Sequence, residues 1–180
     1  MKKTILSIAL VLATGLLFAQ KKTTTAAIIK FDATTSLDKL PKADNLTAIA
    51  SLDTKTGQIA FEANMKNFSF SNPKMQEHFN SPTWLDSEKF PTASFKGGIT
   101  NLSKVDFSKN GTYPVTVKGE LTIHGVTKPV ETGGSIVVSG KTINATADFS
   151  IKLEDYGISS TYIDNGKVAK EPKISVAAEF

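Results

Sequence analysis

Residues 112–125 read TYPVTVKGELTIHG, and this stretch sets the pattern that decides the fold. Apolar or small residues occupy every second position from Tyr113 to Ile123, and mostly threonine and charged residues lie between them. A period of two is typical of a strand with one buried face and one face in water. The stretch ends in His124-Gly125, a dipeptide that favours a tight turn. It therefore predicts a half-buried strand followed by a hairpin turn.

The same alternation returns in 59–65, 143–153 and 174–180, so the chain is expected to be all-β. Gly- and Asn-containing dipeptides mark candidate turns between the runs, at Asn110-Gly111, Gly133-Gly134, Ser139-Gly140 and Asn165-Gly166. Strands separated by turns roughly every 8–12 residues indicate an antiparallel sandwich or barrel.

Two segments do not follow the strand pattern. Asn72-Pro73 predicts the start of a short helical segment near 72–90, because Asn is a good N-cap and Pro suits the first helical position. Residues 21–26 (KKTTTA) are expected to form a polar leader.

The N-terminus has the features of an export signal. Two lysines follow Met1, an apolar run extends from Ile5 to Phe18, and Ala19-Gln20 is a plausible cleavage point. The run is shorter than the roughly 20 apolar residues that a membrane-spanning helix needs. We therefore expect residues 1–19 to be a signal peptide and 20–180 to be one mature domain, periplasmic or secreted.

Composition excludes several classes of protein. The 180 residues are 40% hydrophobic and 21% charged, which is typical of a soluble globular chain and not of a disordered one. No Cys is present, so disulfides, thiolate metal sites and cysteine nucleophiles are excluded. All 21 basic residues are Lys and they are scattered, whereas nucleic-acid sites rely heavily on Arg. We expect no nucleic-acid partner.

Catalytic motifs are absent from the sequence: it contains no phosphate-binding glycine loop, nucleophile elbow or paired-histidine zinc helix. Its two histidines, His78 and His124, could hold a metal with Glu77 or Asp86, but their spacing does not require it. Structural hydrogen bonding is the simpler interpretation. The carboxylates near turns are expected to cap and solvate them, namely Asp86, Glu88, Glu154 and Asp155.

Several motifs together resemble the YceI-like family. They are MQEHF (75–79), DSEKFPTASFKG (86–97), GELTIHGVTKPV (119–130), FSI (149–151) and DYGI (155–158). The resemblance spans roughly 57–180 with these motifs in the family's order and spacing, and LTIHGVTKP is its most specific part. The N-terminal third departs from the family pattern, in which an early strand bears Trp and His.

The resemblance implies an extended antiparallel, eight-stranded, lipocalin-like barrel. Members of the family are exported proteins that hold a long amphiphile, such as a polyisoprenoid or isoprenoid quinone, in an apolar tunnel. It thus implies a binding protein for transport or storage, with no catalytic residue, no metal and no cofactor beyond such a lipid. A homodimer is compatible with this, and stable membrane insertion is not expected.

Inward-facing apolar side chains are the candidates for the tunnel wall. They are Phe61, Phe68, Phe70, Met75, Phe79, Trp84, Phe90, Phe95, Ile123, Phe149 and Ile151. A polar head group would need partners near an opening, and His78 and Tyr156 are the candidates for that role.

Three alternatives remain open from the residues alone. Alternation does not distinguish a hollow barrel from a filled one that serves as a structural or interaction module, because eight-stranded barrels can be either. An outer-membrane barrel would need strands of about 9–11 residues and two aromatic girdles, which three Tyr and one Trp supply poorly. A secreted hydrolase or isomerase would use His78 and His124, but no activated nucleophile accompanies them.

Overall fold

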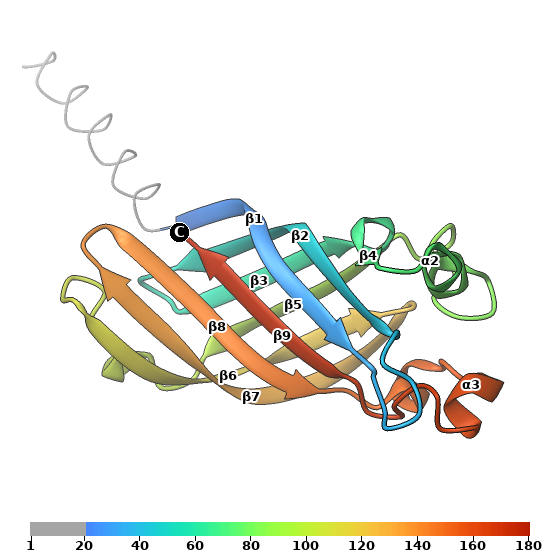
Figure 1. Cartoon of the computed structure of the whole chain (residues 1–180). Helices are drawn as coiled ribbons and strands as arrows, with labels where there is room; N and C mark the ends of the chain where they lie inside the picture. The colour runs from blue at the N-terminus through green and yellow to red at the C-terminus, as the bar shows by residue number, and fades with distance from the viewer. Residues whose placement is uncertain (1–20) are drawn as a thin grey trace, which may run out of the picture.

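The computed structural model describes residues 21–180, so the expected signal peptide and its cleavage point lie outside the described part of the chain. Strands dominate this part, and helices are few and short (Figure 1). The strands are β1 (Lys21–Asp32), β2 (Lys42–Asp53), β3 (Gln58–Asn64), β4 (Ser69–Phe70), β5 (Thr92–Ile99), β6 (Gly111–Ile123), β7 (Val126–Ser139), β8 (Thr142–Ser150) and β9 (Lys173–Glu179). The helices are α2 (Pro73–Asn80) and α3 (Thr161–Asp164), with 3-10 turns η1 (Met65–Asn67), η2 (Leu102–Lys104) and η3 (Leu153–Tyr156).

Eight strands close into a barrel. Their order is β1-β9-β8-β7-β6-β5-β3-β2, and pairing of β1 with β2 completes the ring. Every pairing is antiparallel, and the two-residue β4 pairs with β2 as one extra strand. Closure removes the unpaired edges that would otherwise attract another chain. The all-β prediction of an eight-stranded antiparallel barrel is confirmed.

The two ends of the barrel differ. At one end, which we call the mouth end, lie the connections 33–41, 65–91, 124–125 and 151–172. Figure 1 shows α2 and α3 at this end, with the C-terminus at the opposite end. The mouth end thus carries most of the chain that lies outside the strands.

The first strand begins earlier than the sequence pattern suggested. Residues 21–26, expected to be a polar leader, form the first half of β1, and Lys21 lies opposite Asp53 of β2. The three consecutive threonines are β-branched and suit an extended backbone, even though their side chains are polar. The polar side chains hid the apolar alternation that marks the other strands, so this half of the strand was not predicted and the leader prediction was wrong.

The Gly133-Gly134 pair is also not a turn, because it lies inside β7. A Cβ on Gly134 would come within 2.7 Å of the carbonyl oxygen of Thr146 on neighbouring β8. Glycine is needed there for the close approach of two backbones and not for a change of direction. The predicted turn at His124-Gly125 does join β6 to β7, and both residues have the positive φ of a tight hairpin turn.

One polar side chain is fully buried where the β1–β2 pairing is irregular. The register shifts on both sides of Ala27, and Asn45, opposite Ile29, is 0% exposed. Its amide nitrogen donates to the Asn64 carbonyl at 3.0 Å, and its Oδ1 accepts from the Thr47 backbone N–H at 3.0 Å. Asn45 therefore satisfies a carbonyl at the end of β3 and a backbone N–H of β2 close to the register shift.

Candidate ligand-binding site

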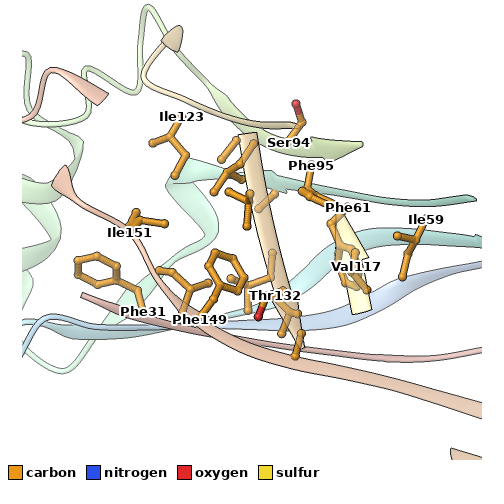
Figure 2. A pocket seen from close by; sticks show the side chains of 18 of the residues that line it. Phe31, Ile59, Phe61, Ser94, Phe95, Val117, Ile123, Thr132, Phe149 and Ile151 are labelled. Carbon is orange, nitrogen blue, oxygen red and sulfur yellow. The ribbon is translucent and has the colours of Figure 1, made fainter. Parts of the chain in front are cut away.

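The barrel encloses a tunnel formed by the inward faces of its strands (Figure 2). It contains about 1220 Å³ of space free of protein atoms, its open part included. The lining side chains come from every strand of the barrel except β2, together with residues 65–85 and 151–158. The alternation seen in the sequence therefore produces a hollow interior, not a fully packed one.

The tunnel wall is almost wholly apolar. Of the 31 residues that line it, only Ser94, Thr132, Ser135 and Thr146 have polar side chains, and none is charged. Such a wall offers few hydrogen bonds, so a polar or charged group entering it would lose its contacts with water without replacement. A hydrocarbon chain would lose nothing comparable and would gain the free energy of leaving water.

The tunnel is also narrow. Its cavity volume clear of the walls is only about 130 Å³, because most of the empty space lies close to a side chain. A slender flexible chain matches this shape better than a compact ring system.

Small residues create the room on one side. Ala147 on β8 lies opposite Gly134 on β7, and a Cβ on Gly134 would be 3.4 Å from that of Ala147. Ala145, on the same strand as Ala147, also lines the tunnel. Larger side chains at these inward positions would occupy the space that is now empty.

Phe95 lies over a pair of facing glycines. Gly97 on β5 lies directly opposite Gly119 on β6, and a Cβ on either would come within 2.7 Å of the tip of the Phe95 ring. The ring thus covers bare backbone, an arrangement that stabilises glycine in strands. It lies along the wall instead of crossing the tunnel.

The end of the barrel opposite the mouth is filled. Leu52, Val138, Ile143 and Ala178 are at most 3% exposed and do not line the tunnel. They lie near the strand ends that are joined by the turns at 54–57 and 140–141. The empty space of the tunnel therefore extends toward the mouth end and not toward the opposite end.

Three aromatic rings separate the tunnel from a second cavity. Phe31, Phe79 and Trp84 line both, and their ring centroids are 5.7–6.3 Å apart in mutual edge or tilted contact. We call these three rings the neck. The second cavity, which we call the vestibule, holds about 1300 Å³ of space, its opening to solvent included, and its walls include residues of α2 and α3.

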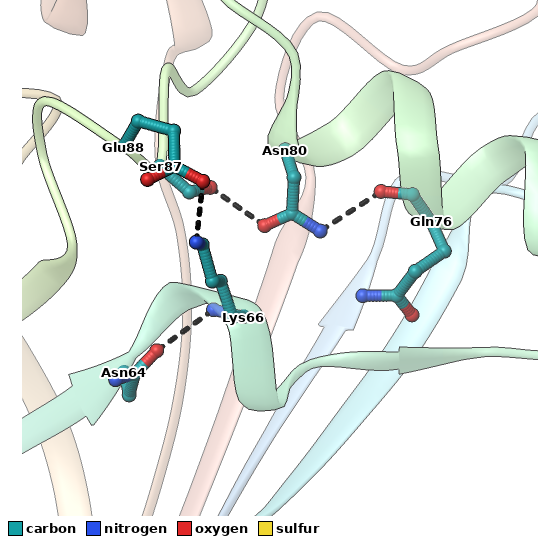
Figure 3. Close-up of polar contacts among 6 residues, drawn as sticks. All are labelled: Asn64, Lys66, Gln76, Asn80, Ser87 and Glu88. Carbon is teal, nitrogen blue, oxygen red and sulfur yellow. Dashed lines mark hydrogen bonds and ion pairs between the residues drawn. The ribbon is translucent and has the colours of Figure 1, made fainter.

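Polar contacts hold the segment that carries two of the three neck rings, Phe79 and Trp84 (Figure 3). Ser87, 1% exposed, donates from its hydroxyl to Asn80 Oδ1 at 2.6 Å, and Asn80 donates to the Gln76 carbonyl at 2.9 Å. Lys66 Nζ pairs with Glu88 at 2.5 Å. The Ser87–Asn80 bond connects α2 to residues 81–90, and the Lys66–Glu88 pair connects the same segment to η1, so the segment that carries Phe79 and Trp84 is held at both points.

The predicted wall residues fall into three groups. Eight line the tunnel: Phe61, Phe68, Phe79, Trp84, Phe95, Ile123, Phe149 and Ile151. Phe70, on β4, and Met75, on α2, line the vestibule instead. Phe90 lines neither cavity, since its ring packs against His124 on the β6–β7 turn. Contact of any of these residues with a ligand stays a prediction.

The two predicted head-group residues are not together. His78 lines the vestibule, with its ring 5.8 Å from that of Tyr162. Tyr156 is 2% exposed and lines neither cavity, and this burial raises the pKa of its hydroxyl. His124 Nδ1–H donates to the Tyr156 carbonyl at 3.1 Å. The geometry therefore places His78, but not Tyr156, where a ligand's polar end could reach it.

Sequence reasoning missed the tunnel residues of β1. Ile29 and Phe31 line the tunnel, and Phe31 is also part of the neck. The available signal was the alternation of Ala27, Ile29 and Phe31, which repeats the period of the recognised strands.

The described residues contain no cluster of side chains that could hold a metal. Within residues 21–180 there is no group of three or more acidic or histidine side chains that could hold a metal ion. Neither cavity is lined by both His78 and His124. No helix in this part of the protein is both long and apolar enough to cross a bilayer.

Comparison with known proteins identifies relatives by sequence. The chain is 27% identical over 116 residues to a UPF0312 protein of Vibrio cholerae, covering 59% of this chain and 58% of that protein. It is 25% identical over 122 residues to Protein YceI of Escherichia coli, covering 64% and 58%. The matches thus span somewhat more than half the length of these curated relatives.

Solved structures share the fold at low identity. A polyisoprenoid-binding domain from Saccharophagus degradans, implicated in plant cell wall breakdown, superposes with a TM-score of 0.74 at 12% identity, covering 89% of this chain and 97% of that domain. BcnA of Burkholderia cenocepacia superposes with a TM-score of 0.70 at 17% identity, covering 87% and 99%. The family model of the YceI-like domain matches residues 14–180. The chain therefore belongs to the YceI-like domain family.

Proposed function

We propose that this protein binds a long apolar amphiphile, such as a polyisoprenoid or an isoprenoid quinone, with its chain inside the tunnel. The observation that carries the proposal is the wall itself, in which four of 31 lining residues have polar side chains and none is charged. The S. degradans domain, described as polyisoprenoid-binding, has the same fold, which supports the proposal by analogy.

Burial of the hydrocarbon chain alone can account for tight binding of such a ligand, without any catalytic group. Burying one methylene yields about 0.8 kcal/mol, but large ligands retain only roughly 0.3 kcal/mol per heavy atom. A chain of about forty carbons would still reach on the order of 12 kcal/mol, which corresponds to a nanomolar dissociation constant. We therefore propose a binding protein for transport or storage and not an enzyme.

The proposal includes export. Residues 1–19 have the charge and hydropathy of a signal peptide, so the working form would be residues 20–180 outside the cytoplasm. Intact mass measurement of the protein from an envelope fraction tests this, because cleavage near Ala19-Gln20 leaves a definite mass. The uncleaved mass would contradict it.

Trp84 provides a direct test of ligand binding. It is the only tryptophan and lies in the neck, so its emission reports on the entrance of the tunnel. The protein is titrated with an isoprenoid quinone and, as a matched control, with the same quinone lacking its isoprenoid tail. We expect a saturable change with the tailed quinone alone. Equal responses to both compounds, or no response to either, would contradict the proposal.

A further inference from the structure

The vestibule differs from the tunnel in both width and polarity. The cavity volume clear of the walls is about 490 Å³ in the vestibule, against about 130 Å³ in the tunnel. Its floor is apolar, formed by the neck rings with Phe70 and Met75. Polar and charged side chains also line it, although most of its wall surface is apolar; they are Asp38, Asn72, Lys74, His78, Thr83, Ser159, Ser160, Thr161, Tyr162 and Lys167. The vestibule thus offers, beside an apolar wall, polar contacts that the tunnel lacks.

Two lysines line the vestibule, and both side chains are exposed to solvent. Lys74 belongs to α2 and Lys167 follows α3, so they come from separate segments of the mouth end. Neither is in a salt bridge, since the ion pairs found across residues 21–180 are Lys66–Glu88 and Lys118–Glu131. His78 lies four residues after Lys74 on the same helix, and its ring also lines the cavity.

Negative charge in the vestibule is limited to one side chain. Asp38 is the single acidic residue among those that line the cavity. One of its carboxylate oxygens accepts the backbone N–H of Leu40 at 2.8 Å within the β1–β2 connection. The two lysines therefore outnumber the carboxylates around this cavity, and the imbalance favours an anion.

We propose that the vestibule binds the anionic head group of the amphiphile, a phosphate or a carboxylate, with Lys74 and Lys167 as its charge partners. This inference rests on the proposed function, because the head group would belong to a chain lying in the tunnel. Lysine ammonium groups recognise anionic oxygens as point charges and tolerate variable geometry, which suits a wide cavity. The neck rings then pack around the chain where it joins the head.

The arrangement also gives specificity between amphiphiles. An alcohol and a phosphate of the same prenyl chain would bury the same hydrocarbon, so the tunnel cannot distinguish them. Only the vestibule contacts the part in which they differ. A difference in affinity between the two therefore measures the contribution of the vestibule alone.

The test uses geranylgeraniol and geranylgeranyl monophosphate, with affinity read from Trp84 emission. We expect the phosphate to bind about tenfold more tightly, as hydrogen bonds to charged groups permit. The double variant Lys74→Gln/Lys167→Gln should lose most of this difference and leave the alcohol's affinity unchanged. Lys55→Gln/Lys141→Gln is the matched control, because both lysines lie in turns at the opposite end of the barrel. A fatty acid and its alcohol, compared in the same way, show whether a carboxylate also suffices.

The outcomes separate this inference from the proposed function. Equal affinity for the alcohol and the phosphate in the unaltered protein would overturn the anionic head-group site and leave the tunnel proposal intact. A phosphate preference that survives in the Lys74/Lys167 variant, or is lost equally in the control variant, would also overturn it. Binding of neither compound would contradict the proposed function itself.

Discussion

The Phe90 ring packs edge-on against the His124 imidazole, with centroids 4.8 Å apart and planes at 75°. A Cβ on Gly125, beside His124 in the hairpin turn, would come within 2.5 Å of the same ring. His124 Nδ1–H in turn donates to the carbonyl of Tyr156. Phe90, the β6–β7 turn and η3 are therefore joined at the mouth end. The His124 of the LTIHG motif therefore belongs to this junction, and its side chain lines neither cavity.

Substitution of Phe90 should lower stability more than ligand affinity. Phe90→Ala removes the contact with His124 and the packing over Gly125, and we expect the free energy of unfolding to fall by about 1–3 kcal/mol for this half-buried ring. Urea denaturation measures the loss. Affinity for an isoprenoid quinone should change by no more than about twofold, since a larger change requires ligand contact. A tenfold loss of affinity in a folded variant would show that Phe90 belongs to the site.

The facing glycines of β5 and β6 should not tolerate a methyl group. In Gly119→Ala the new Cβ would lie 2.4 Å from the carbonyl oxygen of Lys96 and 2.7 Å from Phe95. Such overpacking costs about 1–3 kcal/mol. Gly133→Ala is the matched control, because nothing lies within 4 Å of its Cβ position. Thermal unfolding should separate the two variants, and equal stabilities would refute the close-approach explanation.

A larger side chain in the small-residue part of the wall should shorten the ligand that fits. Ala147→Phe places a ring in the tunnel opposite Gly134 and beside Val176. We expect affinity for a long prenyl quinone to fall about tenfold or more and that for a short-chain analogue to remain nearly unchanged. Titration across a series of tail lengths measures this. Uniform loss across the series would indicate general unfolding, which circular dichroism would also detect.

Burial of Tyr156 should make the free energy of unfolding fall as the pH rises into the alkaline range. Because desolvation raises the pKa of Tyr156 in the folded state above its ordinary value of 10.0, its neutral form is favoured by folding. The contribution is fully present below pH 10.0 and is lost as pH rises through the folded pKa. Tyr156→Phe should therefore weaken the alkaline loss in urea denaturation.

The same variant tests the head-group prediction for Tyr156. Ligand affinity should be unchanged in Tyr156→Phe at neutral pH, because the side chain lines neither cavity. A loss of affinity would restore Tyr156 as a ligand contact.

Periodicity predicted most of the barrel because the inner face must be apolar at every second position. β6, β8 and β9 follow that rule along nearly their whole length, and the helix start at Asn72 follows capping chemistry, with Asn72 Oδ1 accepting from the Lys74 backbone N–H. β1 was missed because half of it is polar threonine and lysine, and that half is held in the sheet by its pairing with β2 alone.

The site was less predictable than the fold. Alternation assigned Phe61 and Phe149 to the interior, but it carries no information on whether a ring crosses the tunnel or lies along its wall. That distinction depends on cross-strand neighbours, such as the glycines beneath Phe95. The neck joins Phe31 to Phe79 and Trp84, which are far apart in the sequence and meet only once the barrel has closed.

The most direct measurement of the central claim is native mass spectrometry of the protein purified without detergent from its own envelope fraction, followed by organic extraction. We expect one amphiphile of several hundred daltons per chain, released by the solvent and identifiable by mass. Ala147→Phe, prepared in parallel, should carry less of it or a shorter homologue. A bare polypeptide mass, unchanged after incubation with isoprenoid quinones and polyprenyl lipids, would contradict the claim that the tunnel is a ligand site.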